Sequence, residues 1–158
     1  MPTHFKGTEE EVRSLNAYIN LMRASGCFYA KVERVLGLQG ISVSQFGVLE
    51  TLLHLGPMCQ KDIAGKILKT EGNLTMVISN LEKRGLVKRS REGKDRRYVT
   101  IALSPKGRSL IAEIFPLHVS VIAREFRHIT SEEQEKLRDI CRKLGKGIQT
   151  GKKQEWLE

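Results

Sequence analysis

The sequence predicts a mainly α-helical fold with one small β-hairpin, and three observations support this prediction. Over six segments of the 158 residues, apolar side chains recur every three or four positions, which is the period of an amphipathic helix. Two short segments on either side of Gly93 have the pattern of strands joined by a tight, charged turn. Serine, threonine, proline and glycine stand where helices would begin and end. The expected order is four helices, two strands and two helices.

The longest predicted helix covers residues 9–36, where the apolar positions are spaced by three and four residues until Gly37. A helix of this length exceeds what a small domain can cover. Part of its apolar stripe is therefore expected to pack against another helix or another subunit. A second helix is expected to start at Ser44, which has the side chain of an N-cap, and to end at Gly56.

Two shorter helices follow and are joined by a tight turn. The first is expected at about residues 60–68. The second is expected to begin at Thr70, as its N-cap, and to end where Gly85 takes a left-handed conformation. It has one polar face and one apolar face, and the apolar positions are Leu74, Val77, Ile78 and Leu81. Two short helices in this arrangement predict a helix-turn-helix.

The segment from Lys83 to Arg97 carries most of the positive charge. It holds eight Lys or Arg residues and two acidic residues, and so supplies six of the nine net positive charges. It includes the first strand and the turn, while residues 98–103 alternate in polarity as the returning strand. A basic hairpin directly behind a helix-turn-helix is suited to holding a phosphate backbone. A solvated run of charges is the alternative.

The C-terminal third predicts two more helices. Ser104 and Pro105 suit the start of one, and Thr130 with Glu133 forms the pattern of a capping box at the start of the other. These two helices and the helix at residues 9–36 carry more apolar side chains than a small lobe requires. A second copy of the chain would cover these side chains. The predicted division is 1–36 as an N-terminal dimerisation helix, 37–103 as a winged helix-turn-helix lobe, 104–150 as C-terminal dimerisation helices and 151–158 as a polar tail.

Composition restricts the class of protein. A net charge of +9 and a pI near 9.7 favour a polyanionic partner. No apolar run approaches the roughly eighteen residues needed to span a membrane. The N-terminus has no signal-peptide pattern, so a cytoplasmic location with no membrane partner is expected.

The cysteines and histidines do not form a chemical site. Cys27, Cys59 and Cys141 have no close spacing and the histidines lack metal-ligand spacing, so no disulfide, metal or cofactor is expected. No nucleophile with a base and an orienting group, and no glycine-rich phosphate loop, is evident, which argues against an enzyme. Cys27 is expected to be a buried, inert thiol, with an oxidant-sensing role as the alternative.

Three motifs in order resemble those of one family. Residues 80–89 read NLEKRGLVKR, residues 95–97 read DRR and residues 103–107 read LSPKG. Together they resemble the MarR family of bacterial transcriptional regulators, over about residues 9–148. The resemblance implies a homodimer in which each subunit presents one winged helix to a pseudo-palindromic operator on double-stranded DNA. It also implies repression of transcription, and release of the DNA by a small anionic or phenolic effector or by an oxidant.

The predicted DNA contacts lie on the second helix of the helix-turn-helix and in the turn of the hairpin. On the helix, Asn73 can pair with an adenine edge and Met76 can contact a thymine methyl group. Basic side chains in the turn suit a narrow minor groove. The resemblance implies that Asp95 orients Arg97 toward DNA. The predicted contact residues of this DNA-binding lobe are Thr70, Gly72, Asn73, Thr75, Met76, Ser79, Lys94, Asp95, Arg96 and Arg97.

Alternatives remain open for the basic surface. A winged helix can also serve as a protein-interaction module without sequence-specific DNA binding, in which the basic hairpin meets an acidic partner. Other cations near the helix-turn-helix are either phosphate contacts or solubilising charge. They are Lys66, Lys69, Lys83, Arg84, Lys88 and Arg89. The sequence assigns no residues to an effector pocket.

Overall fold

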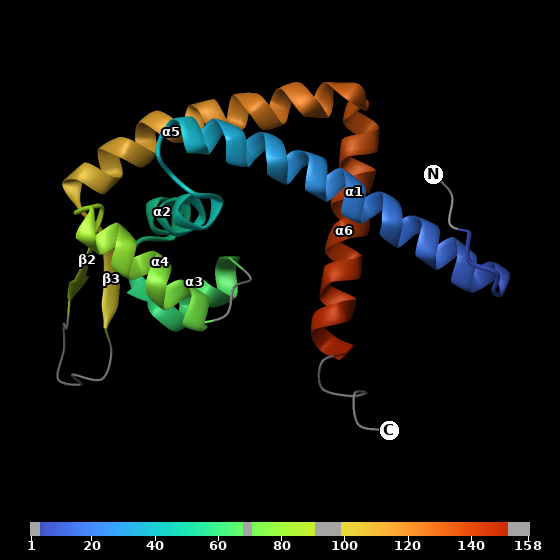
Figure 1. The fold of residues 1–158 in the computed structure, drawn as a ribbon, viewed down its shortest axis with the longest axis horizontal. Helices are drawn as coiled ribbons and strands as arrows, with labels where there is room; N and C mark the ends of the chain where they lie inside the picture. The colour runs from blue at the N-terminus through green and yellow to red at the C-terminus, as the bar shows by residue number, and fades with distance from the viewer. Residues whose placement is uncertain (1–3, 68–70, 91–98, 152–158) are drawn as a thin grey trace. The chain divides into compact units, whose positions relative to one another are not determined.

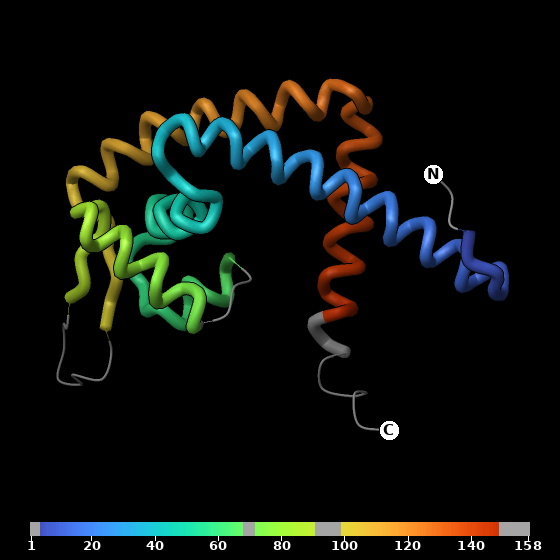
Figure 2. The backbone as a smooth tube through the Cα atoms, in the orientation of Figure 1, coloured from blue at the N-terminus to red at the C-terminus, as the bar shows by residue number. Residues whose placement is uncertain are grey.

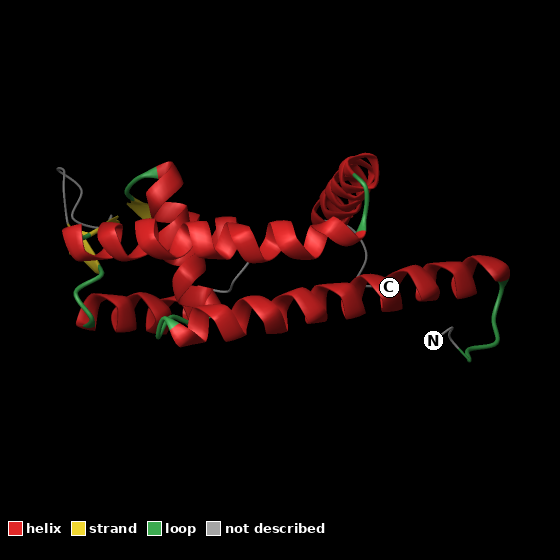
Figure 3. Cartoon of the chain, turned by 90° about the horizontal axis from the view of Figure 1, so that it is seen from above, coloured by secondary structure: helices red, strands yellow, loops and turns green. Residues whose placement is uncertain are grey.

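The structure is a computed structural model that describes residues 4–67, 71–90 and 99–151. It confirms a mainly α-helical fold with one small antiparallel sheet (Figure 1 and Figure 3). The chain divides into two compact units, Met1–Val121 and Ile122–Glu158. In chain order the elements are α1 (Glu9–Leu38), α2 (Val43–Leu55), β1 (Met58–Cys59), α3 (Gln60–Ile67), α4 (Glu71–Lys83), β2 (Val87–Ser90), β3 (Thr100–Leu103), α5 (Pro105–Glu125), the short 3-10 helix η1 (Phe126–His128) and α6 (Ser131–Gly151).

Helix α1 begins with a capping box and ends in the core of the first unit. The Thr8 hydroxyl accepts a hydrogen bond from the Glu11 amide at 3.2 Å, and the Glu11 carboxylate accepts one from the Thr8 amide at 2.8 Å. Leu36, near the C-terminal end of the helix, is buried, whereas Cys27 is exposed. The prediction of a buried Cys27 is wrong for the single chain. Leu36 is the only fully buried residue of this 30-residue helix, so the core of the first unit covers little of its length.

Helix α2 starts two residues earlier than predicted. Its N-cap is Ser42, whose hydroxyl accepts a hydrogen bond from the Gln45 amide at 3.2 Å. In return the Gln45 side-chain oxygen accepts a hydrogen bond from the Ser42 amide at 3.1 Å. The prediction of Ser44 as the N-cap is wrong because the residue three positions after Ser44 is Gly47, which has no side chain to complete a capping box.

The core of the first unit forms where α2, α3 and α4 each pack on the other two (Figure 2). Leu36 of α1, the sheet and α5 complete it. Full burial of one such aliphatic side chain contributes about 1.5–3 kcal/mol. The buried side chains of this core are Leu36, Ile41, Phe46, Val48, Leu49, Leu52, Ile63, Ala64, Leu74, Ile78, Leu81, Leu86, Val87, Ile101, Ile111 and Ile114.

The sheet has three antiparallel strands in the order β1-β3-β2. Val87 pairs with Leu103 and Ser90 with Thr100, so β2 and β3 form the predicted hairpin. Strand β1 was not predicted. It has only two residues, too few to show an alternating pattern, and it forms because the outer edge of β3 offers it hydrogen-bonding groups.

The start of α5 is joined to the end of α4 by a compact set of hydrogen bonds. As predicted, Ser104 is the N-cap, and its hydroxyl accepts a hydrogen bond from the Gly107 amide at 2.9 Å. The same hydroxyl donates to the carbonyl oxygen of Gly85 at 2.6 Å. Gly85 has a φ of 69°, the left-handed conformation that its place after α4 predicts. Gly107 is buried against the backbone of Leu86, and a Cβ atom at Gly107 would overlap the Leu86 carbonyl oxygen.

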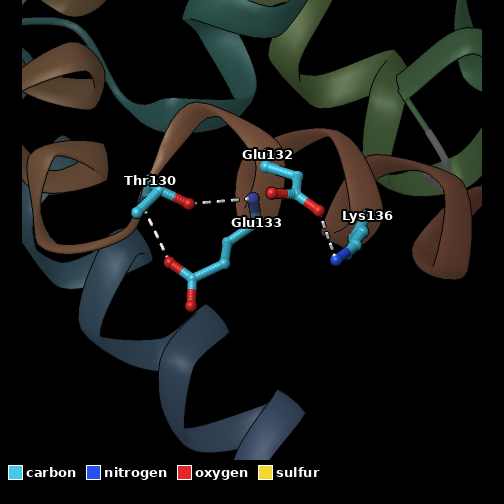
Figure 4. A network of polar contacts seen from close by, with 4 residues as sticks. All are labelled: Thr130, Glu132, Glu133 and Lys136. Atoms are coloured by element: carbon cyan, nitrogen blue, oxygen red, sulfur yellow. Dashed lines mark hydrogen bonds and ion pairs between the residues drawn. The ribbon is translucent and has the colours of Figure 1, made fainter.

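The second unit contains the predicted capping box at the start of α6 (Figure 4). The Thr130 hydroxyl accepts a hydrogen bond from the Glu133 amide at 3.2 Å, and the Glu133 carboxylate accepts one from the Thr130 amide at 2.7 Å. One turn further, Lys136 forms an ion pair with Glu132 at 2.7 Å. The apolar residues of α6 are exposed in the single chain. They are Leu137 (40%), Ile140 (64%), Leu144 (48%) and Ile148 (59%).

Candidate nucleic-acid interface

Helix α4 has one face in the core and one face toward solvent, as the sequence predicts. Leu74, Ile78 and Leu81 are fully buried. On the other side, the Met76 side chain is 68% exposed. Among the predicted contact residues, Gly72, Asn73, Thr75 and Met76 are exposed and Ser79 is half-buried. Thr70, predicted as the N-cap, lies outside the described residues. We call the side of α4 that carries the five described residues the α4 outer face.

A side chain of α3 holds one residue of the α4 outer face. The Gln60 amide group donates a hydrogen bond from Nε2 to Thr75 Oγ1 at 2.7 Å. The hydrogen bond fixes the Thr75 hydroxyl and links the first helix of the helix-turn-helix to the second. The sequence analysis did not identify Gln60 as part of the site. Gln60 and Thr75 lie fifteen positions apart, and no periodic pattern relates them.

An arginine of the hairpin holds a second residue of the α4 outer face. Arg89 on β2 donates a hydrogen bond from Nη2 to Ser79 Oγ at 3.2 Å, and its Nε lies 3.3 Å from Glu82 Oε2. The sequence left Arg89 as either a phosphate contact or a solubilising charge. In the structure it connects the hairpin to α4, and the sequence analysis missed Glu82 altogether.

Arg84 contacts the connection between α1 and α2, which the sequence analysis did not predict. Its Nη1 donates a hydrogen bond to the Gly40 carbonyl oxygen at 2.8 Å and lies 3.4 Å from the Gln45 side-chain oxygen. Its own carbonyl oxygen accepts a hydrogen bond from Lys106 Nζ at 3.1 Å. Arg84 therefore ties the C-terminal end of α4 to the connection between α1 and α2, rather than serving only as surface charge.

The hairpin carries its charge beside α4. Val87 of β2 is buried, while Lys88 is exposed and the side chain of Arg89 is 33% exposed. The predicted wing residues Lys94, Asp95, Arg96 and Arg97 lie between β2 and β3 in the sequence, outside the described residues. The exposed cations of β2 next to the hydroxyl and amide groups of α4 form a surface that can bind phosphates and base edges.

The surface is hollowed at the N-terminal half of α4. A cavity of about 330 Å³ has an open mouth and is bordered by α2, α3 and α4. Its lining includes three predicted contact residues. The residues that line it are Ser44, Ile67, Gly72, Asn73, Leu74, Met76 and Val77. The α4 outer face therefore presents both a ridge and an adjoining hollow.

Two histidines and two phenylalanines meet between α2 and α5, a cluster that the sequence analysis missed. The ring centroids of His118 and Phe46 are 4.4 Å apart, and His54 meets the ring of Phe115 edge-on at 4.9 Å. Burial lowers the pKa of His118, and the carboxylate of Glu50 opposes this effect. Phe115 and His118 are three residues apart on α5, and this helical spacing is the signal that could have revealed the cluster.

The described residues contain no group of three or more histidine, cysteine or acidic side chains arranged to hold a metal ion. Within the same ranges, none of the helices is sufficiently long and apolar to cross a membrane. The candidate site on the first unit is therefore the α4 outer face together with the basic strand β2 beside it.

Comparisons with known proteins agree with this geometry. The sequence matches the MarR family over residues 41–99. It is 35% identical over 138 residues to the uncharacterized HTH-type transcriptional regulator YkoM of Bacillus subtilis strain 168, covering 87% of this chain and 90% of that protein. The HTH-type transcriptional repressor MdtR of the same organism is 28% identical over 116 residues, covering 73% of this chain and 75% of that protein.

One solved structure, that of BpsR from Bordetella bronchiseptica, is similar to this chain over most of both chains. It was solved to explain how 6-hydroxynicotinic acid regulates the DNA binding of BpsR. The TM-score is 0.76 at 25% sequence identity, and the match covers 82% of this chain and 98% of that chain. The similarity to YkoM extends well beyond residues 41–99 at both ends. This chain belongs to the MarR family, and it is a DNA-binding transcriptional regulator and not an enzyme.

Proposed function

We propose that this protein is a homodimeric repressor that binds a pseudo-palindromic operator and is released from it by a small molecule. The observation that supports this most directly is the α4 outer face. It is a row of amide, hydroxyl and thioether groups on a helix whose opposite face is fully buried, beside a strand with exposed cations. A helix held in this way fits the major groove of B-DNA.

In this proposal the α4 outer face reads bases and the wing holds the backbone. The amide of Asn73 pairs with an adenine edge, and the Met76 side chain meets a thymine methyl group. A Cβ atom at Gly72 would meet no described neighbour within 4 Å, and the absence of a side chain favours close approach of the DNA backbone. The wing residues Lys94, Arg96 and Arg97 enter the minor groove, where Asp95 orients Arg97.

The exposed apolar residues support a homodimer. On α6, the apolar positions from Leu137 to Ile148 follow a helical spacing and so lie on one face. On α1, Tyr18 is 60% exposed and Tyr29 is 49% exposed. A second copy of the chain would cover these side chains and place two α4 helices about one turn of DNA apart, roughly 34 Å. Residues 1–36 and 104–150 are therefore proposed as dimerisation segments and 37–103 as the DNA-binding lobe.

The proposed direction of control is repression relieved by a small molecule. MdtR, a similar protein, is named as a repressor, and the DNA binding of BpsR is regulated by 6-hydroxynicotinic acid. We propose a small molecule rather than an oxidant because none of the three cysteines belongs to α4 or to β2, the elements of the candidate interface. The Cys59 thiol also donates a hydrogen bond to Asp62 Oδ2 at 3.1 Å.

The experiment is selection of bound genomic fragments, followed by affinity measurements on the enriched operator and a scrambled duplex. We expect Asn73→Ala to weaken operator binding by about 1–3 kcal/mol, the contribution of one good base contact, with little change on the scrambled duplex. Asn20→Ala, the same change on exposed α1, is the control, and sedimentation checks that it assembles as wild type does because α1 is a proposed dimerisation segment. Binding to DNA without any sequence preference, or tighter binding to an acidic protein than to any duplex, would favour a protein-interaction module instead.

A further inference from the structure

We propose that Glu82 is an internal competitor for DNA. Its carboxylate holds Arg89 in the unbound protein, and a backbone phosphate competes with this carboxylate for Arg89 when DNA binds. The inference rests on the proposed function, because it assigns a role to residues that border the α4 outer face. It concerns how tightly that face binds any duplex, whatever the operator sequence.

The first part of the argument is the position of Arg89. Its guanidinium forms an ion pair with Glu82 at 3.3 Å and a hydrogen bond with Ser79 at 3.2 Å. Ser79 and Glu82 are three residues apart, so their side chains lie on the same side of α4. Ser79 is itself one of the predicted contact residues. Arg89 is therefore already at the edge of the surface that is proposed to meet DNA.

The second part is the chemistry of the pair. A guanidinium group binds a carboxylate and a phosphate in the same way, through N–H donors directed at anionic oxygens. The Nε donor that Arg89 directs at Glu82 is not available to a phosphate at the same time, and the negative charge of Glu82 repels a phosphate that approaches the other donors of the same guanidinium. A phosphate therefore competes with the Glu82 contact for Arg89.

The third part is access. The side chain of Arg89 is 33% exposed and that of Glu82 is 41% exposed, so solvent and a phosphate can both reach the pair. An ion pair at such a site is weak, because water and salt screen it. Arg84, by contrast, donates to the Gly40 carbonyl oxygen at 2.8 Å. Arg89 is thus positioned to exchange partners, whereas Arg84 holds α4 to the rest of the lobe.

A double-mutant cycle tests the proposal. The affinity for a mixed-sequence duplex of about 30 base pairs, long enough for two half-sites, is measured by fluorescence anisotropy. The variants are Glu82→Gln, Arg89→Gln and the two together. We expect Glu82→Gln to tighten binding about two- to five-fold, the range of a surface ion pair. In the Arg89→Gln background the same change should have almost no effect.

Two further measurements sharpen the test. Arg89→Gln should reduce the slope of log affinity against log salt by about 0.9, because one phosphate contact is lost. Asp62→Asn, the same charge change on exposed α3 and outside the proposed dimerisation segments, should change affinity much less than Glu82→Gln. Circular dichroism checks that each variant keeps its fold. If Arg89→Gln does not, Arg89→Lys takes its place in the cycle and should reduce the effect of Glu82→Gln.

The results separate this inference from the proposed function. If Glu82→Gln tightens binding equally with and without Arg89, then Glu82 only repels DNA at long range, and the inference is overturned. The same holds if Glu82→Gln does not alter affinity while the wild-type protein binds the duplex. A wild-type protein that ignores every duplex at low salt would instead overturn the proposed function, and the inference with it.

Discussion

Gly107 gives the sharpest test of how α4, the hairpin and α5 are held together. A Cβ atom at this position would overlap the Leu86 carbonyl oxygen, which also accepts a hydrogen bond from the Ser104 amide at 3.0 Å. Forcing a methyl group into such a site costs about 1–3 kcal/mol, and loss of the hydrogen bond costs about 1 kcal/mol more. The higher helix propensity of alanine returns about 1 kcal/mol. The net loss expected for Gly107→Ala is therefore about 1–3 kcal/mol.

The assay is urea unfolding followed by circular dichroism, with all variants at one protein concentration because assembly would also contribute to stability. The control is Gly65→Ala on α3, where a Cβ atom meets none of the described residues within 4 Å. There the propensity gain is unopposed, so we expect about 1 kcal/mol of stabilisation. Equal effects of the two substitutions, or a Gly107→Ala protein as stable as wild type, would refute the packing argument.

Two other predictions concern pH and assembly. Because burial lowers the pKa of His118, protonation favours the unfolded chain, so stability present above a pH of about 6.5 should be lost as the pH falls below it. In thermal unfolding, His118→Phe should lose less stability than wild type between pH 7.5 and pH 5.5, and equal losses would contradict this origin. On α6, Ile140→Lys should produce monomers in sedimentation and weaken DNA binding, since it puts a charge into the proposed dimer interface. Glu135→Lys, on the opposite face of α6, should remain dimeric, and an unchanged Ile140→Lys dimer would exclude this stripe.

The sequence predicted the elements whose signals are local. Helix periodicity identified all six α-helices, and side chains that cap within three residues correctly placed the starts of α5 at Ser104 and α6 at Thr130. The error at Ser44 has the same origin. Two serines compete as N-caps within one turn, and only the capping partner Gln45 distinguishes Ser42 from the other.

The contacts that shape the candidate site were not predictable in the same way. Gln60 meets Thr75 across fifteen positions, and Arg89 meets Ser79 across ten. Such pairs depend on how α3, α4 and β2 pack, and that packing is determined by the buried core rather than by any local pattern. The sequence identified which residues of α4 face outward, but not which neighbouring side chains hold them. The predicted wing residues and the predicted dimer interface remain predictions.

The hydrogen bonds on α4 also bear on how the protein could be retargeted to a new DNA sequence. Thr75 and Ser79 each accept a hydrogen bond from another element, so replacing either one would disturb a neighbouring helix or strand as well as the base preference. Met76, which lies one turn before Ser79 on α4, is 68% exposed to solvent. If α4 reads bases as proposed, a library aimed at altered specificity should randomise Met76 first. It should leave Arg84 and Gly40 intact, since their hydrogen bond holds the C-terminal end of α4.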